Sequence, residues 1–245
     1  MSWELYYTSA ERGVNPHSHG FCTVARTETM PIAVVERLES LSHYSPVYPA
    51  GSDRADRNPV AWSHWRIPVG ARTRSVLSRV AFVASDYTGR AGNFAHHVLL
   101  EPSEQAPAGP VALLREPGVM EARWEAGPMM LPARIIEAAP SQDPPGASGA
   151  TWPARLAEAF VADPDRPAYV IYEAGADLLP MLGEAVALLP TALRWQVTFS
   201  TYFTELPAGL ACAWRCVPAG SPAVAAARGA PGLVIDLTGN DPAPV

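Results

Sequence analysis

Hydrophobic and polar residues alternate along much of the chain with the period of two that is typical of half-buried β-strands. In residues 194–202, for example, Trp195, Val197 and Phe199 alternate with polar residues. A continuous apolar run at 80–84 indicates a more central strand. We predict strands at Glu4–Thr8, Phe21–Arg26, Trp62–Val69, Ser75–Ala84, Phe94–Leu100, Val111–Arg115, Tyr169–Glu173, Arg194–Tyr202, Ala211–Val217 and Leu233–Leu237.

The apolar spacing changes to three and four residues in a few segments, which predicts amphipathic helices. Helices are expected at Pro31–Leu41, Thr151–Val161, Asp177–Leu189 and Pro222–Arg228. Pro31 stands at the first helical position of its segment, and Pro190 stops the third helix. Strands and helices do not alternate as in a parallel doubly wound fold. The order predicts an α+β fold: mostly antiparallel sheet or sheets, with three to four helices packed on them.

The chain of 245 residues is expected to form a single domain over residues 1–245. Residues 140–150, rich in proline and small side chains, are the candidate position of a subdivision. Residues 239–245 are expected to form a flexible tail.

Composition limits the classes of function. Hydrophobic residues make up 48% and charged residues 17% of the chain, as in a globular protein. The net charge of −6 argues against nucleic-acid binding, which favours a basic surface. The longest apolar stretch, 174–193, is interrupted by Asp177, Pro180, Glu184 and Pro190, so no membrane span is predicted. With three cysteines and no signal-peptide pattern at the start, we expect a cytoplasmic protein.

The chain contains no lysine, so all 18 of its Lys+Arg residues are arginines. A GC-rich genome explains this bias best, because alanine, proline and glycine are also abundant. Selection against modification of lysine amines is the alternative, and the sequence leaves it open.

A glycine-rich turn beginning at Gly89 carries Arg90 and Asn93 and leads into a strand with His96 and His97. Adjacent strand residues face opposite sides, so the two histidines cannot bind one ion from this strand. One of them could act as an acid or base, or bind an anion together with Arg90. The plainer interpretation is a core histidine satisfied by a backbone carbonyl, with the glycines serving a hairpin.

The loop between the first two strands places His17 and His19 two residues apart. With Cys22, or with His96 or His97, they could complete a three-ligand metal site, although their spacing matches none of the strong zinc patterns. A loop stabilised by its own side-chain hydrogen bonds is favoured. Cysteines four apart on one strand would be about 13 Å apart, so Cys212 and Cys216 are expected to pack in the core.

Common catalytic motifs are missing. The sequence has no phosphate-binding P-loop, no G-x-S-x-G elbow, no H-E-x-x-H and no C-x-x-C. We therefore predict no catalytic residue, no metal ligand and no cofactor. The residues predicted to form a binding surface are His17, His19, Arg90, Asn93, His96 and His97.

Three blocks of sequence, weak singly but more specific together, resemble the N-terminal domain of the GTPase-associated proteins of bacteria. The blocks are Leu5–Ser9 with Gly20–Ala25, Met30-Pro31 and Glu36–Leu41; Gly89–His97; and Leu189–Tyr202. Such proteins are encoded beside GTPases in NTP-dependent conflict or regulatory systems. The resemblance implies an adaptor or sensor whose partner is a GTPase or a GTPase-linked effector, and it supplies no catalytic residues. It also implies that middle and C-terminal regions commonly follow this domain.

Three functions remain to be compared. The first is a non-enzymatic adaptor or sensor that binds a GTPase through residues 13–20 and 90–97. The second is a hydrolase-like or nuclease-like effector, which requires the histidines to converge within about 6 Å. The third is a sensor of a phosphate or nucleotide signal, in which Arg90 and the amides of the glycine turn bind the phosphate.

Overall fold

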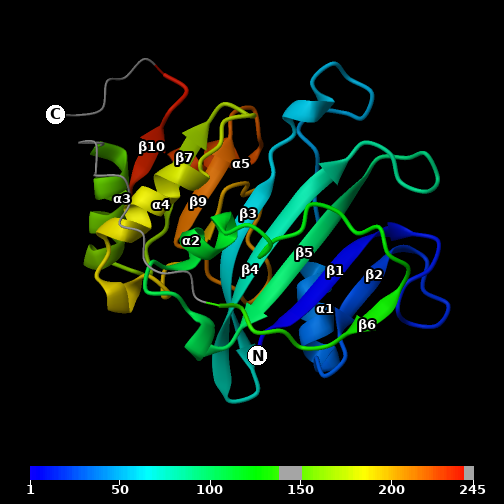
Figure 1. Cartoon of the computed structure of the whole chain (residues 1–245). Coiled ribbons are helices and arrows are strands. Elements are labelled where there is room, and N and C mark those ends of the chain that lie inside the picture. The colour runs from blue at the N-terminus through cyan, green and yellow to red at the C-terminus, as the bar shows by residue number, and fades with distance from the viewer. Residues whose placement is uncertain (138–150, 240–245) are drawn as a thin grey trace.

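The computed structural model describes residues 1–137 and 151–239, and within them ten strands form one sheet (Figure 1). The strand order is β10-β7-β9-β8-β3-β4-β5-β1-β2-β6. The strands are β1 (Trp3–Ala10), β2 (Gly20–Thr27), β3 (Ala61–Val69), β4 (Arg72–Val83), β5 (Gly92–Leu100), β6 (Met129–Leu131), β7 (Ala168–Tyr172), β8 (Phe199–Ser200), β9 (Trp214–Pro218) and β10 (Val234–Asp236). The helices of the same residues are α1 (Ile32–Ser40), α2 (Pro110–Arg115), α3 (Thr151–Ala162), α4 (Leu179–Leu188) and α5 (Ala223–Arg228).

The prediction of an α+β fold is confirmed, but the prediction of a mostly antiparallel sheet is wrong. Strands β8, β3, β4, β5, β1 and β2 are antiparallel to their neighbours in that series. Strands β10, β7, β9 and β8 are parallel to one another, and β6 is parallel to β2. The sheet is therefore mixed. Sequence patterning could not reveal this, because a short buried strand has the same apolar pattern in either direction.

The described residues also contain one more helix than the three to four predicted. The predicted strand at Val111–Arg115 is instead part of α2, with Pro110 in its first turn. A short apolar run fits a buried strand and a buried helix equally well. The predicted strand at 194–202 is reduced to the two residues of β8. In the segment before β8, the indole of Trp195 donates a hydrogen bond of 2.7 Å to the Ala106 carbonyl, and this bond holds Trp195 outside the sheet.

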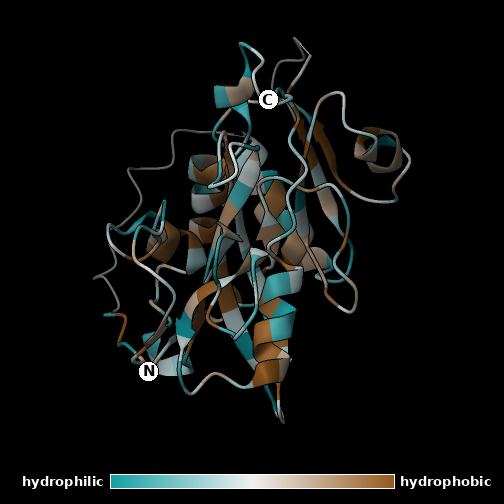
Figure 2. Cartoon of the chain, turned by 90° about the vertical axis from the view of Figure 1, so that its right-hand side faces the viewer, coloured by the Kyte–Doolittle hydropathy of each residue, from teal (hydrophilic) through white to brown (hydrophobic). Residues whose placement is uncertain are grey.

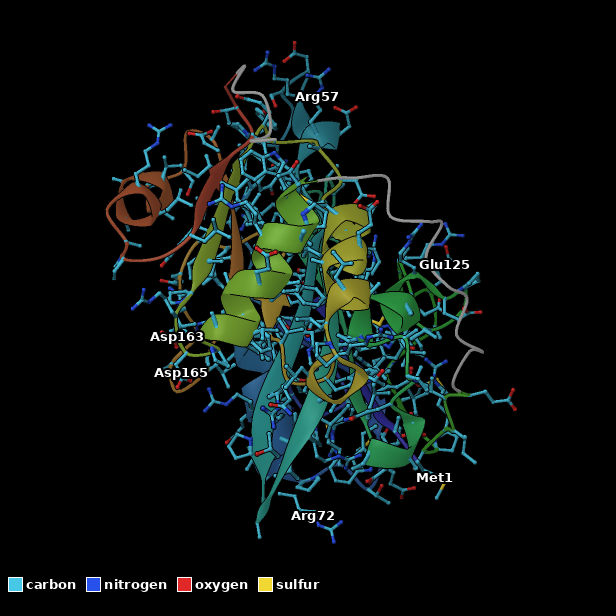
Figure 3. All side chains as sticks on the ribbon, turned by 90° about the vertical axis from the view of Figure 1, so that its left-hand side faces the viewer. Met1, Arg57, Arg72, Glu125, Asp163 and Asp165 are labelled. Atoms are coloured by element: carbon cyan, nitrogen blue, oxygen red, sulfur yellow. The ribbon has the colours of Figure 1, made fainter. Side chains whose placement is uncertain are left out.

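Helices cover both faces of the sheet. Two neighbouring residues of β5 show the division, since Val98 packs with α2, α3 and α4, whereas Leu99 packs with α1 on the opposite face. Figure 3 shows α3 and α4 lying across their face of the sheet. In Figure 2 the strands carry alternating hydrophilic and hydrophobic bands, as expected for strands whose two faces meet different surroundings.

Two predictions fall on residues outside the described part of the chain. They are the whole of the candidate boundary at 140–150 and residues 240–245 of the predicted tail at 239–245. Among the helices of residues 1–137 and 151–239, none combines the length and the apolar character needed to span a bilayer.

Candidate functional site

Two loops lie at the same end of the sheet. Strand β1 is antiparallel to both of its neighbours, β2 and β5, and β5 is antiparallel to β4. The β1–β2 loop (residues 11–19) and the β4–β5 loop (residues 84–91) therefore project from the same edge, as Figure 1 shows. We call these loops and the first residues of the strands that follow them, residues 11–21 and 84–92, the tip surface.

Direct contacts join the two halves of the tip surface. The Ser9 hydroxyl donates a hydrogen bond of 2.6 Å to the Asp86 carboxylate. This bond, together with one from the Thr88 hydroxyl, holds the pKa of Asp86 well below its ordinary value. A side chain added at Gly92 would lie 3.4 Å from the ring of Phe21, so the start of β5 packs closely against the start of β2. The two loops therefore form one surface.

The β1–β2 loop packs against β2, the strand that follows it. A Cβ atom at Gly13 would lie 2.3 Å from the Ser18 hydroxyl and 2.8 Å from the Thr23 carbonyl, so this close approach requires glycine. The amide of the next residue, Val14, donates a hydrogen bond of 2.8 Å to the Thr23 carbonyl. The loop thus has a defined shape, and it holds His17 and His19 on the exterior.

The β4–β5 loop is organised by a carboxylate of this chain. Oxygen Oδ1 of Asp86 accepts hydrogen bonds from the Thr88 amide at 2.7 Å and from the Arg90 amide at 3.0 Å. The phosphate-sensor hypothesis requires the amides of the glycine turn that begins at Gly89. Two of these, the amides of Gly89 and Arg90, already donate to oxygens of Asp86, so they are not free for a phosphate. The Arg90 side chain is exposed.

Exposed aromatic residues accompany Arg90 at this end of the sheet. Phe21 is 50% exposed and Tyr87 is 46% exposed, although both are large apolar side chains. Phe21 stacks on Tyr7, with ring centroids 6.3 Å apart, so its ring is held in place. Sequence analysis missed both residues, because a single sequence does not show which aromatic residues are exposed.

His96 is fully buried and belongs to an internal polar cluster. Its Nδ1 accepts a hydrogen bond of 2.9 Å from the Glu121 amide, so Nε2 carries the proton and donates to Glu4 at 3.2 Å. Glu4 also pairs with Arg134 at 2.8 Å. Burial lowers the pKa of His96, which favours the neutral ring. The cluster connects β1 and β5 to the chain segment that crosses this face of the sheet.

His97 is fully buried on the opposite face, between two serines. The Ser42 hydroxyl donates to the Leu38 carbonyl at 3.0 Å, so it accepts from Nε2 of His97 at 2.9 Å. Nδ1 then accepts from Ser78 at 2.8 Å. Burial lowers the pKa of His97 to about 3. Asn93 is buried beside this group and donates to the Ser42 carbonyl at 2.8 Å.

The structure thus divides the six predicted binding residues into two groups of three. His17, His19 and Arg90 are exposed at the tip surface, whereas Asn93, His96 and His97 are interior. The prediction that His96 and His97 face opposite sides agrees with their separate partners. Both histidines lie in the core, but the predicted backbone carbonyl is not their partner. His96 is bonded to the Glu121 amide and the Glu4 carboxylate, and His97 to two serine hydroxyls.

The hydrolase hypothesis is not supported by this arrangement. Within residues 1–137 and 151–239, no group of three histidine, cysteine or acidic residues is placed to hold a metal ion. Ser78 and His97 are hydrogen-bonded, but a histidine with a pKa of about 3 is a poor base at neutral pH. The cavity that Ser78 lines has a volume of about 110 Å³, well below the roughly 300 Å³ of small ligand sites.

Comparison with known families identifies the class of protein. Two family models match, and both describe GTPase-associated proteins. The first, GTPase-associated protein 1, N-terminal domain type 2, matches residues 1–135, and the second, GTPase-associated protein 1, middle domain, matches residues 142–239. The chain belongs to the GTPase-associated protein 1 family, and the resemblance seen in the sequence is confirmed. No curated protein and no solved structure matches the chain.

Proposed function

We propose that this chain is a non-enzymatic adaptor or sensor module that binds a partner GTPase, or an effector linked to one, through the tip surface. Membership of the GTPase-associated family supports a GTPase-related partner. The observation that carries the proposal is the joining of two loops, with exposed aromatic and basic side chains, at one end of the sheet. The module acts in a bacterial conflict or regulatory system, in the cytoplasm, as a single domain that binds neither nucleic acid nor membranes.

The chemistry of the tip surface suits protein recognition. Interfaces between proteins are enriched in aromatic residues and arginine, and such residues dominate the binding energy. Here Phe21, Tyr87 and Arg90 provide these groups. The sheet fixes the bases of both loops, so less conformational entropy is lost when the partner binds.

Binding to the GTPase encoded beside this chain tests the proposal. We expect Phe21→Ala and Arg90→Glu each to weaken the complex by about tenfold or more, as for central interface residues. Leu188→Ala and Arg72→Glu are matched controls, because Leu188 is 48% exposed on α4 and Arg72 is exposed at the β3–β4 hairpin. Both controls should bind like the unmodified chain.

The affinity should be measured by calorimetry with the GTPase loaded with GDP and with a non-hydrolysable GTP analogue. A difference between the two states would mark a sensor of the nucleotide state, whereas equal affinities would mark an adaptor. No binding in either state would refute the proposed function. Equal losses in tip and control variants would refute the tip surface as the binding site.

A further inference from the structure

A second candidate site lies in the parallel part of the sheet, away from the tip surface. A cavity of about 390 Å³ opens at the amino ends of β8 and β9. This volume is within the range of small-molecule sites, about 300–1,000 Å³. Apolar side chains form part of its wall, namely Phe160, Leu206 and Leu210.

Four contacts hold the side chain of Arg215, which lines this cavity. Its Nε donates to the Cys212 carbonyl at 3.0 Å, and its Nη1 donates to the Tyr169 hydroxyl at 2.6 Å. The guanidinium also lies over the rings of Tyr169 and Phe203, with centroid distances of 5.3 and 5.0 Å. These contacts fix the orientation of a half-buried cation before any ligand binds.

This fixed cation has no acidic partner within the described residues, and none of its hydrogen bonds there uses Nη2. Partly buried arginines are normally paired with a carboxylate, because desolvation of an unpaired charge is costly. Arg215 lines the cavity, and Nη2 is its one donor nitrogen without a hydrogen bond among the described residues. The geometry is that of a guanidinium held ready for an anion.

A second arginine lines the same cavity. Arg66 comes from β3, is exposed, and forms no ion pair with any described residue. One carboxylate, Asp165, lies at the cavity, and Figure 3 labels it just beyond the end of α3. Two guanidinium groups against one carboxylate leave an excess of positive charge, although the whole chain is acidic.

The cysteine that lines the cavity indicates a binding site rather than a catalytic one. Cys212 lines the wall, and burial raises its pKa to about 12, so it is a protonated thiol at neutral pH. Its Sγ donates to the Trp214 carbonyl at 3.3 Å. A cavity of about 570 Å³ is less suited to an anion, because Asp56 and Asp177 line it together with a single arginine, Arg57.

We propose that the cavity at Arg66 and Arg215 binds a small molecule that carries a phosphate group. A doubly charged phosphate matches two guanidinium groups better than a single carboxylate does, and arginine favours such oxyanions. The apolar wall at Phe160, Leu206 and Leu210 would contact the organic part of the molecule. The site is separate from the tip surface, so this proposal does not depend on GTPase binding.

Calorimetry on the purified chain at low salt tests the site, with inorganic phosphate, pyrophosphate, AMP, GMP and the dicarboxylate succinate as probes. We expect at least one phosphate-bearing probe to bind, and succinate to bind about tenfold more weakly or not at all. Affinity should fall as salt is added, because charged contacts are screened.

Arg66→Gln and Arg72→Gln form the matched pair of variants. Both arginines are exposed, so both variants should fold, and Figure 3 shows Arg72 at the tip of the β3–β4 hairpin, away from Asp165. Arg66→Gln should weaken phosphate binding about tenfold, whereas Arg72→Gln should leave it unchanged. Arg215→Gln should abolish binding, with circular dichroism reporting whether it folds.

Three results would overturn the proposal: no phosphate-bearing probe binds, succinate binds as tightly as the phosphates, or Arg66→Gln and Arg72→Gln have equal effects. Because the assay contains no GTPase, these results leave the proposed function unaffected. In the same way, loss of GTPase binding in tip variants leaves the cavity proposal unaffected.

Discussion

Two regions of the sheet differ in how completely their polar side chains are hydrogen-bonded. One is the pair of buried histidines on β5, His96 and His97, and the other is the cavity lined by Arg66 and Arg215. Both nitrogens of His97 are bonded to serines of this chain, and both nitrogens of His96 are bonded as well. Arg215 lines a cavity and is held by bonds from two of its nitrogens, and its third nitrogen has no hydrogen-bond partner among residues 1–137 and 151–239.

This difference separates structural polar groups from candidate binding groups. A buried group whose hydrogen bonds are all made within the chain stabilises the fold and has nothing left for a ligand. A fixed group with one open donor can bind a ligand with little loss of conformational entropy. Residue type alone would have favoured the histidines, and the hydrogen bonds favour the arginines.

Acid should produce the largest effect, because it acts on the buried histidines. Besides His97, the antiparallel part of the sheet buries His64 on β3. Burial lowers the pKa of His97 to about 3 and that of His64 to about 4, from the usual 6.5. The unfolded chain therefore binds more protons below pH 6.5, and the folded state loses stability as the pH falls. From pH 6.5 to 5 we expect about 1.5 kcal/mol of lost stability for each histidine.

Urea unfolding at pH 7 and at pH 5 measures this loss. In His97→Leu, the loss of unfolding free energy between pH 7 and pH 5 should be smaller by the contribution of one histidine, about 1.5 kcal/mol. This holds whatever the variant does to the stability at pH 7. An unchanged pH dependence in this variant would show that His97 is not held neutral in the folded state. At about pH 8 neither histidine should contribute, since both are then almost entirely neutral in the folded and unfolded chains.

Removal of Glu4 should have the next largest effect. Glu4→Ala leaves the buried Nε2 proton of His96 unpaired and takes the acidic partner from Arg134. We expect a loss of about 2 kcal/mol in the free energy of unfolding. Glu121→Ala is the control, because its exposed carboxylate is not part of these bonds and only its amide contacts His96. Equal losses in both variants would contradict a structural role for the cluster.

Replacement of Arg215 should change stability less than replacement of Glu4. Arg215→Met removes two hydrogen bonds and two cation–π contacts but leaves no buried acid without a partner. We expect a loss of about 1 kcal/mol in thermal or urea unfolding. A loss larger than that of Glu4→Ala would place Arg215 with the structural groups and weaken the contrast between the two regions.

The smallest effect is expected for the hydrogen bond from Ser9, near the end of β1, to Asp86 in the β4–β5 loop. Ser9→Ala removes the main cause of the low pKa of Asp86, so this pKa should rise towards its ordinary value. Titration of the Asp86 carboxyl by NMR measures the change, and Thr88→Ala should raise the same pKa by a similar or smaller amount. Hydrogen exchange of residues 84–91 should increase in Ser9→Ala, and an unchanged pattern would show that the loops are positioned without this bond.

The sequence by itself determined the long antiparallel strands and the family. Residues 61–69, 72–83 and 92–100 were predicted nearly to their ends, because period-two patterning over eight or more residues favours one structure. The same patterning failed at 110–115 and 194–202, where short apolar runs are compatible with a helix or a turn. The tertiary structure alone decided these segments, by burying them against distant residues.

For the candidate sites, the sequence determined which side chains were present, and the tertiary structure decided which remain free. Arg90 could be predicted as a surface residue of a glycine-rich turn, but the filling of that turn by Asp86 depends on folding. Nothing local distinguishes His96 and His97, whose ring nitrogens are all bonded, from Arg215, one of whose nitrogens has no hydrogen bond within the part of the chain that the structure describes. Hydrogen-bond partners come from strands and loops far apart in the chain, so only the folded arrangement shows whether a polar group is already satisfied.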